Sequence, residues 1–249
     1  MASFHLLSHA LLAAFMISCA FSTIAQASNP ESEKWLIENA ESYPPPTVVT
    51  LPSGLQFKIL REGDGKFHPA PTTPTKCHYE GRLRDGTIFD SSYRRIEPST
   101  FAPSQVIKGW TEAMQLMVEG DKWELYVPSH LGYGDAGQGD KIPGGDVLIF
   151  IIEMIDIEGK NDAEHVVEAR RCNVATMEGC NEKENGYVTK ATTKFDSGDK
   201  KRKEMERIVK VASDNKNVKG DVKFWATRRI LLLNRMLVEE EGYIYGDEF

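Results

Sequence analysis

Alternating apolar and polar residues in the middle of the chain indicate β-strands. Apolar or small residues occupy every second position from Leu55 to Ile59 and again from Cys77 to Gly81. Successive side chains of a strand point to opposite faces, so this pattern predicts strands with one buried face. The pair Asp85-Gly86 after the second strand is the signal of a hairpin turn, and a further strand is predicted to enter Phe89.

Two later segments read as strands. Trp123–Val127 is predicted to form one, and the apolar run Val147–Ile157 predicts a strand that is covered on both sides. A glycine-rich loop, 132–145, joins them.

A period near 3.6 residues appears once among these strands. The segment Gln105–Val118 places Trp110, Met114 and Met117 on one face, and Gly120 ends it. Several antiparallel strands around one short helix define an α+β fold.

Helical periodicity also appears on both sides of this region. Glu31–Glu41 predicts a short amphipathic helix, which the prolines at 44–46 end. Beyond Gly159 the sequence is charged and helix-forming. We expect helices at Asp162–Arg171, Lys200–Ala212 and Val222–Glu241. A loop is expected over Cys172–Gly186. In the second of these helices, Ile208, Val211 and Ala212 are expected to face the last helix.

The N-terminus resembles a secretory signal peptide. An apolar run, 10–25, leads into the small-residue site Ala25-Gln26-Ala27. The run is shorter than the roughly 20 residues of a spanning helix, so we expect cleavage after Ala27 and no membrane attachment afterwards. The domain division is therefore 1–27 signal peptide, 28–50 helix and linker, 51–158 folded domain and 159–249 helical extension.

Length and charge narrow the functional classes. The 249 residues, 41% of them hydrophobic, suffice for one good-sized domain and an accessory region. A formal net charge of −7 argues against a nucleic-acid surface, which needs a basic face. The basic cluster Lys200–Lys203 lies among acidic residues, and we interpret it as a solvated helix start.

The signal peptide predicts an oxidising compartment, where cysteines can form disulfides. Cys77 lies in an alternating strand pattern and is expected to be a buried, inert thiol. Cys172 and Cys180 are close enough in sequence for a disulfide that closes a small loop. Neither belongs to a CxxC or has a histidine nearby, so no metal site is expected.

The chemistry-bearing residues of the domain suggest binding more than bond cleavage. Aromatic and branched apolar residues gather near strand ends and turns, together with one carboxylate, Asp90, and one phenol, Tyr133, but no plausible nucleophile. Each alone has a structural explanation. Asp90 fits a turn, Trp110 a core and Tyr133 a surface.

Five segments of the central region occur in a characteristic order: HYEGRLRDGTIFDSS, QVIKGWTEAMQLM, GDKWELYVP, LGYG and IPGGDVLIFIIEMIDI. Together they resemble the FKBP-type peptidyl-prolyl cis/trans isomerases, from Leu51 to about Glu158. The opening LPSGLQFKIL is most similar to the secreted, macrophage-infectivity-potentiator-like branch. The resemblance implies an antiparallel half-barrel sheet wrapped round the short helix, followed by the all-helical extension.

The resemblance also implies a proline-binding pocket. Its lining would be Tyr79, Phe89, Val106, Ile107, Trp110, Tyr133, Ile142 and Phe150. Trp110 would form the floor, and Asp90 would accept hydrogen bonds and orient the rim with Arg95 as its basic partner. The Tyr133 hydroxyl and the Ile107 N–H would bind substrate carbonyls.

Departures from the family pattern concern the rim. Ser99 stands where many members have an aromatic wall residue, Gln105 replaces a common glutamate, and Gly144-Gly145 follows Pro143 where a second proline is frequent.

The implied activity is acceleration of X–Pro bond rotation in folding client proteins, without covalent step, metal or cofactor. Proline-containing polypeptides and macrolide inhibitors are the expected ligands. One alternative is a non-catalytic FKBP-like module that binds proline segments or acts as a chaperone. Another is a structural protein whose function lies in the helical tail.

The C-terminal region suggests a location and a partner. The segment 245–249 resembles a retention tetrapeptide. Together with the signal peptide, it predicts a location in the lumen of the endoplasmic reticulum, and secretion is the alternative. The segments KEMERIV and WATRRILLLNRML resemble the helical domain of reticulum disulfide-isomerase relatives. We expect these helices to bind another protein, and no redox activity, because they carry no CxxC.

Overall fold

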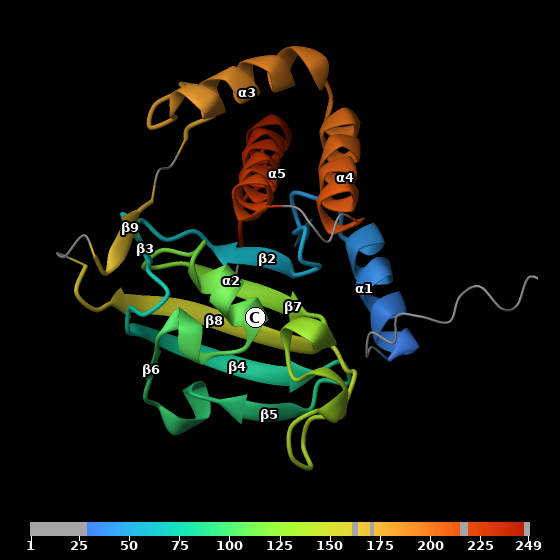
Figure 1. The fold of residues 1–249 in the computed structure, drawn as a ribbon, viewed down its shortest axis with the longest axis vertical. Helices are drawn as coiled ribbons and strands as arrows, with labels where there is room; N and C mark the ends of the chain where they lie inside the picture. Colours follow the sequence, from blue (N-terminus) through green and yellow to red (C-terminus); the bar gives the residue numbers. More distant parts are fainter. Residues whose placement is uncertain (1–28, 161–163, 170–171, 215–218, 247–249) are drawn as a thin grey trace, which may run out of the picture.

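A curved β-sheet wraps a short helix, and further helices lie outside it (Figure 1). The computed structural model describes residues 29–160, 164–169, 172–214 and 219–246. The predicted signal peptide lies outside these ranges. Within them, no helix combines the length and the apolar character that crossing a membrane requires.

The main sheet has seven antiparallel strands in the order β1-β2-β7-β8-β4-β5, with β6 also paired to β4. The strands are β1 Val49–Thr50, β2 Gln56–Arg61, β4 Thr75–Leu83, β5 Ile88–Ser91, β6 Ser99–Phe101, β7 Lys122–Val127 and β8 Leu148–Ile157. The predicted strands and the α+β class are confirmed. A separate pair joins β3 Phe67–Pro69 to β9 Val166–Glu168.

The register of the strands divides their residues between two faces. Phe57, Leu125 and Phe150 stand side by side on β2, β7 and β8 and are all buried. One position along, Tyr126 and Ile149 pair on the opposite face. Side chains alternate across a strand, so the first row faces the enclosed helix and the second faces outward.

The enclosed helix α2, Lys108–Met114, is shorter than predicted. Gln105 belongs instead to a 3₁₀ turn, η2 (Pro103–Gln105), where its side chain accepts a hydrogen bond from the Ala102 N–H at 3.1 Å. Gly109 permits close packing of α2 on the sheet, since a Cβ there would lie 2.7 Å from a methyl carbon of Val127.

Strand β2 departs from strict alternation. Leu60 comes directly after Ile59, so strict alternation would turn it away from the face of Phe57 and Ile59, yet it is only 3% exposed. The pairing of β2 with β7 shifts register between Ile59 and Arg61. A β-bulge of this kind reorients the side chains that follow it, which explains the buried leucine.

The N-terminal helix α1, Pro30–Ser42, packs on the outer face of the sheet. Asn29 caps it by accepting the Glu31 N–H. Trp35 and Leu36 contact the cluster of Val48, Tyr126 and Ile149. The predicted amphipathic helix is thus confirmed, and it covers the face that α2 leaves open.

The C-terminal extension contains three helices, α3 Glu182–Lys194, α4 Gly198–Asp214 and α5 Gly220–Glu241. In Figure 1, α4 and α5 lie side by side and α3 crosses above them. The last two helices were predicted; α3 was not. It begins within the expected loop, because Asn181 and Glu184 form a reciprocal capping box.

Three predictions for this region are wrong. The described part of 162–171 contains strand β9 in place of a helix, because β3 supplies a pairing partner. Lys201 is 5% exposed and pairs with Glu240, so this part of the basic cluster is not solvated. Val211 is 58% exposed, because the contact with α5 is made by the turn of α4 that carries Ile208 and Ala212.

Candidate active site

Four aromatic rings pack edge to face between α2 and the sheet. The Trp110 ring lies 5.2 Å from the rings of Tyr79 and Phe150, at interplanar angles of 77° and 86°. Phe89 meets Phe150 at 5.5 Å and 83°. This perpendicular packing suits the quadrupoles of aromatic rings and fixes their positions.

Phe101 is a fifth member that the sequence analysis missed. Its ring lies 5.7 Å from that of Tyr79 and 5.8 Å from that of Trp110. It stands two residues beyond Ser99 on β6, which pairs with β4 through Phe101 and Thr75. Residues two apart on a strand share a face, so a strand assignment for 99–101 would have found it.

Gly81 provides the space that two of these rings occupy. A Cβ at this position would lie 2.5 Å from Cε2 of Phe89 and 2.7 Å from Cε1 of Phe150. Real Cβ atoms do not approach carbon so closely. The absence of a side chain on β4 therefore determines where the two rings stand.

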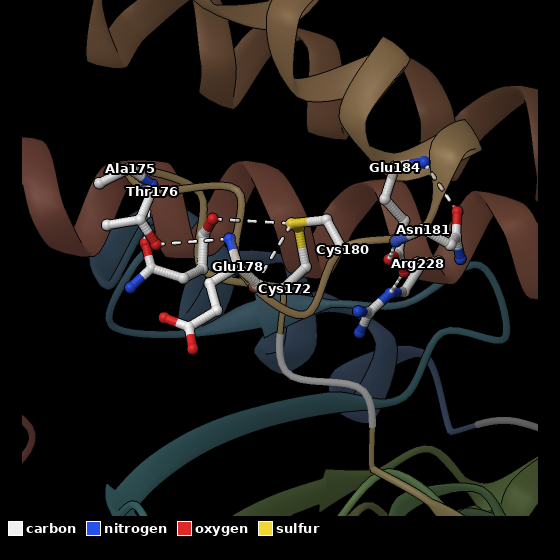
Figure 2. The surroundings of a disulfide bond; sticks show 9 residues. Cys172, Ala175, Thr176, Glu178, Cys180, Asn181, Glu184 and Arg228 are labelled. Carbon is white, nitrogen blue, oxygen red and sulfur yellow. Dashed lines mark hydrogen bonds and ion pairs between the residues drawn. A yellow bond between two sulfur atoms is a disulfide. The ribbon is translucent and has the colours of Figure 1, made fainter.

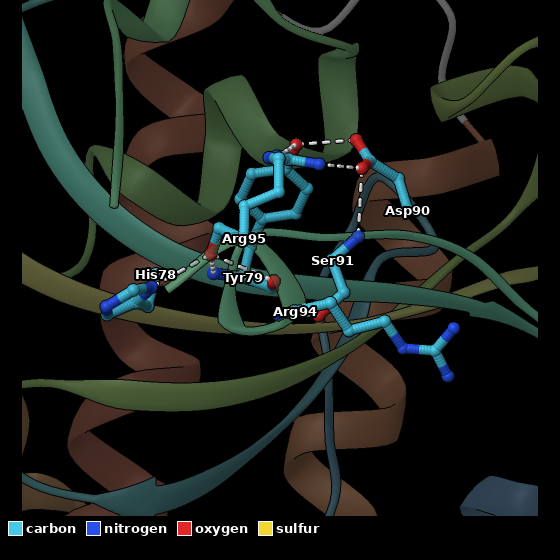
Figure 3. A network of polar contacts seen from close by, with 7 residues as sticks. His78, Tyr79, Asp90, Ser91, Arg94 and Arg95 are labelled. Carbon is cyan, nitrogen blue, oxygen red and sulfur yellow. Dashed lines mark hydrogen bonds and ion pairs between the residues drawn. The ribbon is translucent and has the colours of Figure 1, made fainter. Parts of the chain in front are cut away.

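A polar triad borders the aromatic rings (Figure 3). The Tyr79 hydroxyl donates to Oδ2 of Asp90 at 2.5 Å. Arg95 donates to Oδ1 of Asp90 at 2.5 Å and to the Tyr79 hydroxyl at 2.8 Å. The Ser91 N–H also donates to Asp90, at 2.9 Å. The predicted pairing of Asp90 with Arg95 is confirmed.

These contacts determine the ionisation of the triad. Burial of the Asp90 carboxyl acts to raise its pKa, but hydrogen bonds from Tyr79 and Arg95 outweigh it, and the pKa lies below its ordinary value. Asp90 is therefore a carboxylate at neutral pH. Burial raises the pKa of Tyr79, and its bond to Asp90 adds to this, so the phenol keeps its proton.

Two donors near the rings are uncommitted. Tyr133 lies between the 3₁₀ turns η3 (Ser129–Leu131) and η4 (Gly134–Ala136), and among the described residues its hydroxyl has no hydrogen-bond partner. Burial and the charge of Asp90 raise its pKa, which keeps the hydroxyl protonated. The N–H of Ile107, the residue before α2, likewise has no acceptor within the described part of the chain.

The remaining predicted residues belong to the same apolar cluster. Ile142 is 7% exposed and comes from the loop before β8. Val106 and Ile107 are partly buried and pack against the cluster that holds Trp110. The structure thus gathers the predicted lining from β4, β5, β8, α2 and two loops.

The cysteines behave as predicted. Cys172 and Cys180 form a disulfide beside the start of α3 (Figure 2). Cys77 is fully buried, and burial raises the pKa of its thiol to about 12. In the ranges that the structure describes, no group of three or more His, Cys, Asp or Glu side chains is arranged to hold a metal ion.

Comparison with known proteins agrees with this geometry. Residues 65–155 match the model of a family described as FKBP-type peptidyl-prolyl cis-trans isomerase. A macrophage infectivity potentiator of Trypanosoma cruzi is 52% identical over 129 residues, which are 51% of this chain and 66% of that protein. The FK506-binding protein 2 of Debaryomyces hansenii is 42% identical over 120 residues, 46% of this chain and 88% of that protein.

The FKBP-type 22 kDa peptidyl-prolyl cis-trans isomerase of Escherichia coli is 45% identical over 132 residues, 53% of this chain and 62% of that protein. Among solved structures, FkpA from Escherichia coli has a TM-score of 0.47 and 34% identity, over 51% of this chain and 59% of that one. The chain therefore belongs to the FKBP-type peptidyl-prolyl isomerase family, in its macrophage-infectivity-potentiator-like branch. The chain spans about half to two thirds of the length of the first curated relatives that it matches.

Proposed function

We propose that the protein accelerates cis/trans isomerisation of X–Pro bonds. The observation that carries the proposal is the aromatic enclosure of Tyr79, Trp110 and Phe150 beside an ionised Asp90. A prolyl ring fits such an apolar enclosure, with Trp110 as its floor and Phe89, Val106 and Ile142 around it.

Amide chemistry explains how this pocket would act. The trans form of an X–Pro bond is favoured by only about 0.5–1 kcal/mol, but rotation crosses a barrier of ~18–20 kcal/mol because it breaks amide resonance. The twisted amide has less charge separation than the planar one. A pocket that removes water therefore binds the transition state better than the ground state.

The free donors would orient the substrate. The Tyr133 hydroxyl and the Ile107 N–H would each donate to a carbonyl oxygen next to the proline. Asp90, held by Arg95, would keep the Tyr79 hydroxyl and the rim in place. No covalent intermediate or cofactor enters this mechanism.

The clients, ligands and location belong to the same proposal. The disulfide between Cys172 and Cys180 supports an oxidising compartment, which fits proline-containing clients in the secretory pathway and the lumen of the endoplasmic reticulum. Macrolides that mimic a prolyl segment would occupy the same pocket. The C-terminal helices would bind a client or a partner protein.

The test is cis-to-trans isomerisation of a short X–Pro peptide by the purified protein and its variants Asp90→Val and Phe89→Ala. Loss of a charge-assisted hydrogen bond or of a ring contact is expected to lower kcat/KM by about tenfold or more. Asp199→Val, on the exposed start of α4, is the matched control and should keep the parental rate. Peptide binding without rate enhancement in the parent protein would favour the non-catalytic binding module.

A further inference from the structure

A buried turn before β2, Leu51–Leu55, lies beside the loop that carries Tyr133. Leu51 and Leu55 are fully buried. The Leu51 N–H donates to the Leu55 carbonyl at 2.8 Å, and the Gly54 N–H donates to the Leu51 carbonyl at 2.9 Å. Buried apolar contacts and internal hydrogen bonds make a segment locally stable, so this turn can hold neighbouring segments in place.

His130 joins the loop of Tyr133 to this turn. Its Nε2 lies 2.9 Å from the carbonyl oxygen of Ser53. A carbonyl oxygen can only accept a hydrogen bond, so Nε2 carries a proton and donates it. The ring also packs against the turn, because a Cβ on Gly54 would lie 3.6 Å from Cε1 of His130. The hydrogen bond and the packing together fix the imidazole on the turn.

The chain from His130 to Tyr133 is short and hydrogen-bonded. His130 belongs to the 3₁₀ turn η3, where the N–H groups of Leu131 and Gly132 donate to backbone carbonyls at 2.9 Å each. The Tyr133 ring is only partly buried, so its backbone contributes strongly to the position of its hydroxyl. A displacement of His130 would therefore also displace the Tyr133 hydroxyl.

The same serine contacts helix α2. The Ser53 hydroxyl donates to the carboxylate of Glu112, and its oxygen accepts the Leu55 N–H at 3.2 Å. Glu112 lies on α2, and Ile107 is the residue directly before that helix. Ser53 therefore links the two elements that carry the proposed substrate donors, the Tyr133 hydroxyl and the Ile107 N–H.

We propose that His130 is a positioning residue of the candidate active site, which ties the Tyr133 loop to Ser53 and thereby sets the spacing between the Tyr133 hydroxyl and the Ile107 N–H. A misplacement of about 1 Å in a group that orients the substrate is enough to slow a reaction. The inference rests on the proposed isomerase function, because it concerns how that site orients its substrate.

The test is a double-mutant cycle of His130→Ala and Tyr133→Phe, read as kcat/KM for a short X–Pro peptide. His130→Ala should lower kcat/KM about two- to tenfold in the parent background, because one hydrogen bond to the loop is lost. In the Tyr133→Phe background the same substitution should have almost no further effect, since the hydroxyl that His130 positions is absent. His130→Gln keeps a side-chain N–H donor and should restore most of the parental rate.

His165→Ala is the matched control. This exposed histidine lies directly before β9, outside the candidate active site, and its replacement should leave the rate unchanged in both backgrounds. Denaturant unfolding of each variant ensures that the rates are those of folded protein. The inference is overturned if His130→Ala keeps the parental rate, if it lowers the rate equally with and without the Tyr133 hydroxyl, or if His130→Gln does not restore it.

The dissociation constant of the same peptide separates this inference from the proposed function. If the parent protein binds the peptide without isomerising it, only the proposed activity is overturned, and the cycle is then read from Kd with the same expected pattern. If the parent isomerises the peptide and His130→Ala does so equally well, only the role of His130 is overturned. A parent protein that neither binds nor isomerises the peptide overturns both.

Discussion

Gly81 sets the shape of the candidate active site at the scale of single residues. Replacement by alanine would place a Cβ within 2.5 Å of Phe89 and 2.7 Å of Phe150. We expect Gly81→Ala to lower the free energy of unfolding by about 1–3 kcal/mol, because both rings must move, and to lower kcat/KM as the pocket changes shape. Denaturant unfolding and the peptide isomerisation assay measure the two effects.

Gly186 provides a matched control for that substitution. It lies within α3, and a Cβ there would meet nothing within 4 Å. Gly186→Ala should raise the unfolding free energy by about 0.5–1 kcal/mol through helix propensity. A Gly81→Ala protein with parental stability and activity would contradict the view that the two rings determine the pocket.

The resemblance to the FKBP family supplied much of the candidate site at this scale, since it implied that Arg95 pairs with Asp90, and the structure shows their ion pair. It did not supply Phe101, because the neighbouring proline and serine obscure a strand of three residues. Nor did it indicate that Lys201 is buried, since this depends on Glu240, far along the chain.

At the scale of elements, helix α2 lies between the aromatic pocket and a cavity of about 1010 Å³ that residues of α3 and α5 also line. Trp110 packs on the aromatic rings of the pocket. Glu112, two residues further along, points to another side of the helix and lines the cavity. Burial raises the pKa of the Glu112 carboxyl, and the Ser53 hydrogen bond and nearby His130 and Lys223 offset this only in part.

This shift predicts how stability depends on pH. Glu112 binds a proton more tightly in the folded protein than in the unfolded chain, where its pKa is near the ordinary 4.5. Its contribution therefore favours folding at low pH and is lost as pH rises from about 4.5 through the higher folded-state pKa. Glu112→Gln should be more stable than the parent protein at neutral pH, with the difference shrinking toward pH 4.

Urea unfolding of both proteins across this pH range measures the effect. Glu97→Gln, at an exposed turn, is the matched control and should leave stability near that of the parent. A constant difference between Glu112→Gln and the parent at every pH would contradict the assignment of the shift to this carboxyl.

Predictability at this scale follows from how local each signal is. The amphipathic periods of α1, α4 and α5 were sufficient to place these helices. Helix α3 was missed because Gly186 and three threonines lower its helix propensity. The Asn181 cap and the contacts of Val188 and Ala191 with the core stabilise it. Strand β9 depends on β3, almost a hundred residues earlier.

The disulfide acts at the scale of the whole molecule. Along the chain it lies between β9, which pairs with β3, and α3, which packs on α5. Closing a loop of this length is expected to contribute about 2–3 kcal/mol, mainly by restricting the unfolded chain.

We expect the double substitution Cys172→Ala/Cys180→Ala to lower the unfolding free energy of the helical extension by about that amount. The isomerisation rate should change little, because none of the pocket residues lies in this segment. Denaturant unfolding with and without dithiothreitol is the measurement. Dithiothreitol should destabilise the parent and leave the double variant unchanged. Equal destabilisation of both would assign the effect to something other than this bond.

The sequence by itself pointed to the family, to five of the strands and to most of the helices, and it allowed the disulfide that the structure shows. These features rest on periodicity, on turn residues and on motif spacing, which are local along the chain. Only the tertiary structure decided the β2 bulge, the role of Phe101 and the burial of Lys201. Each of these joins residues from distant segments, and no local pattern specifies such contacts.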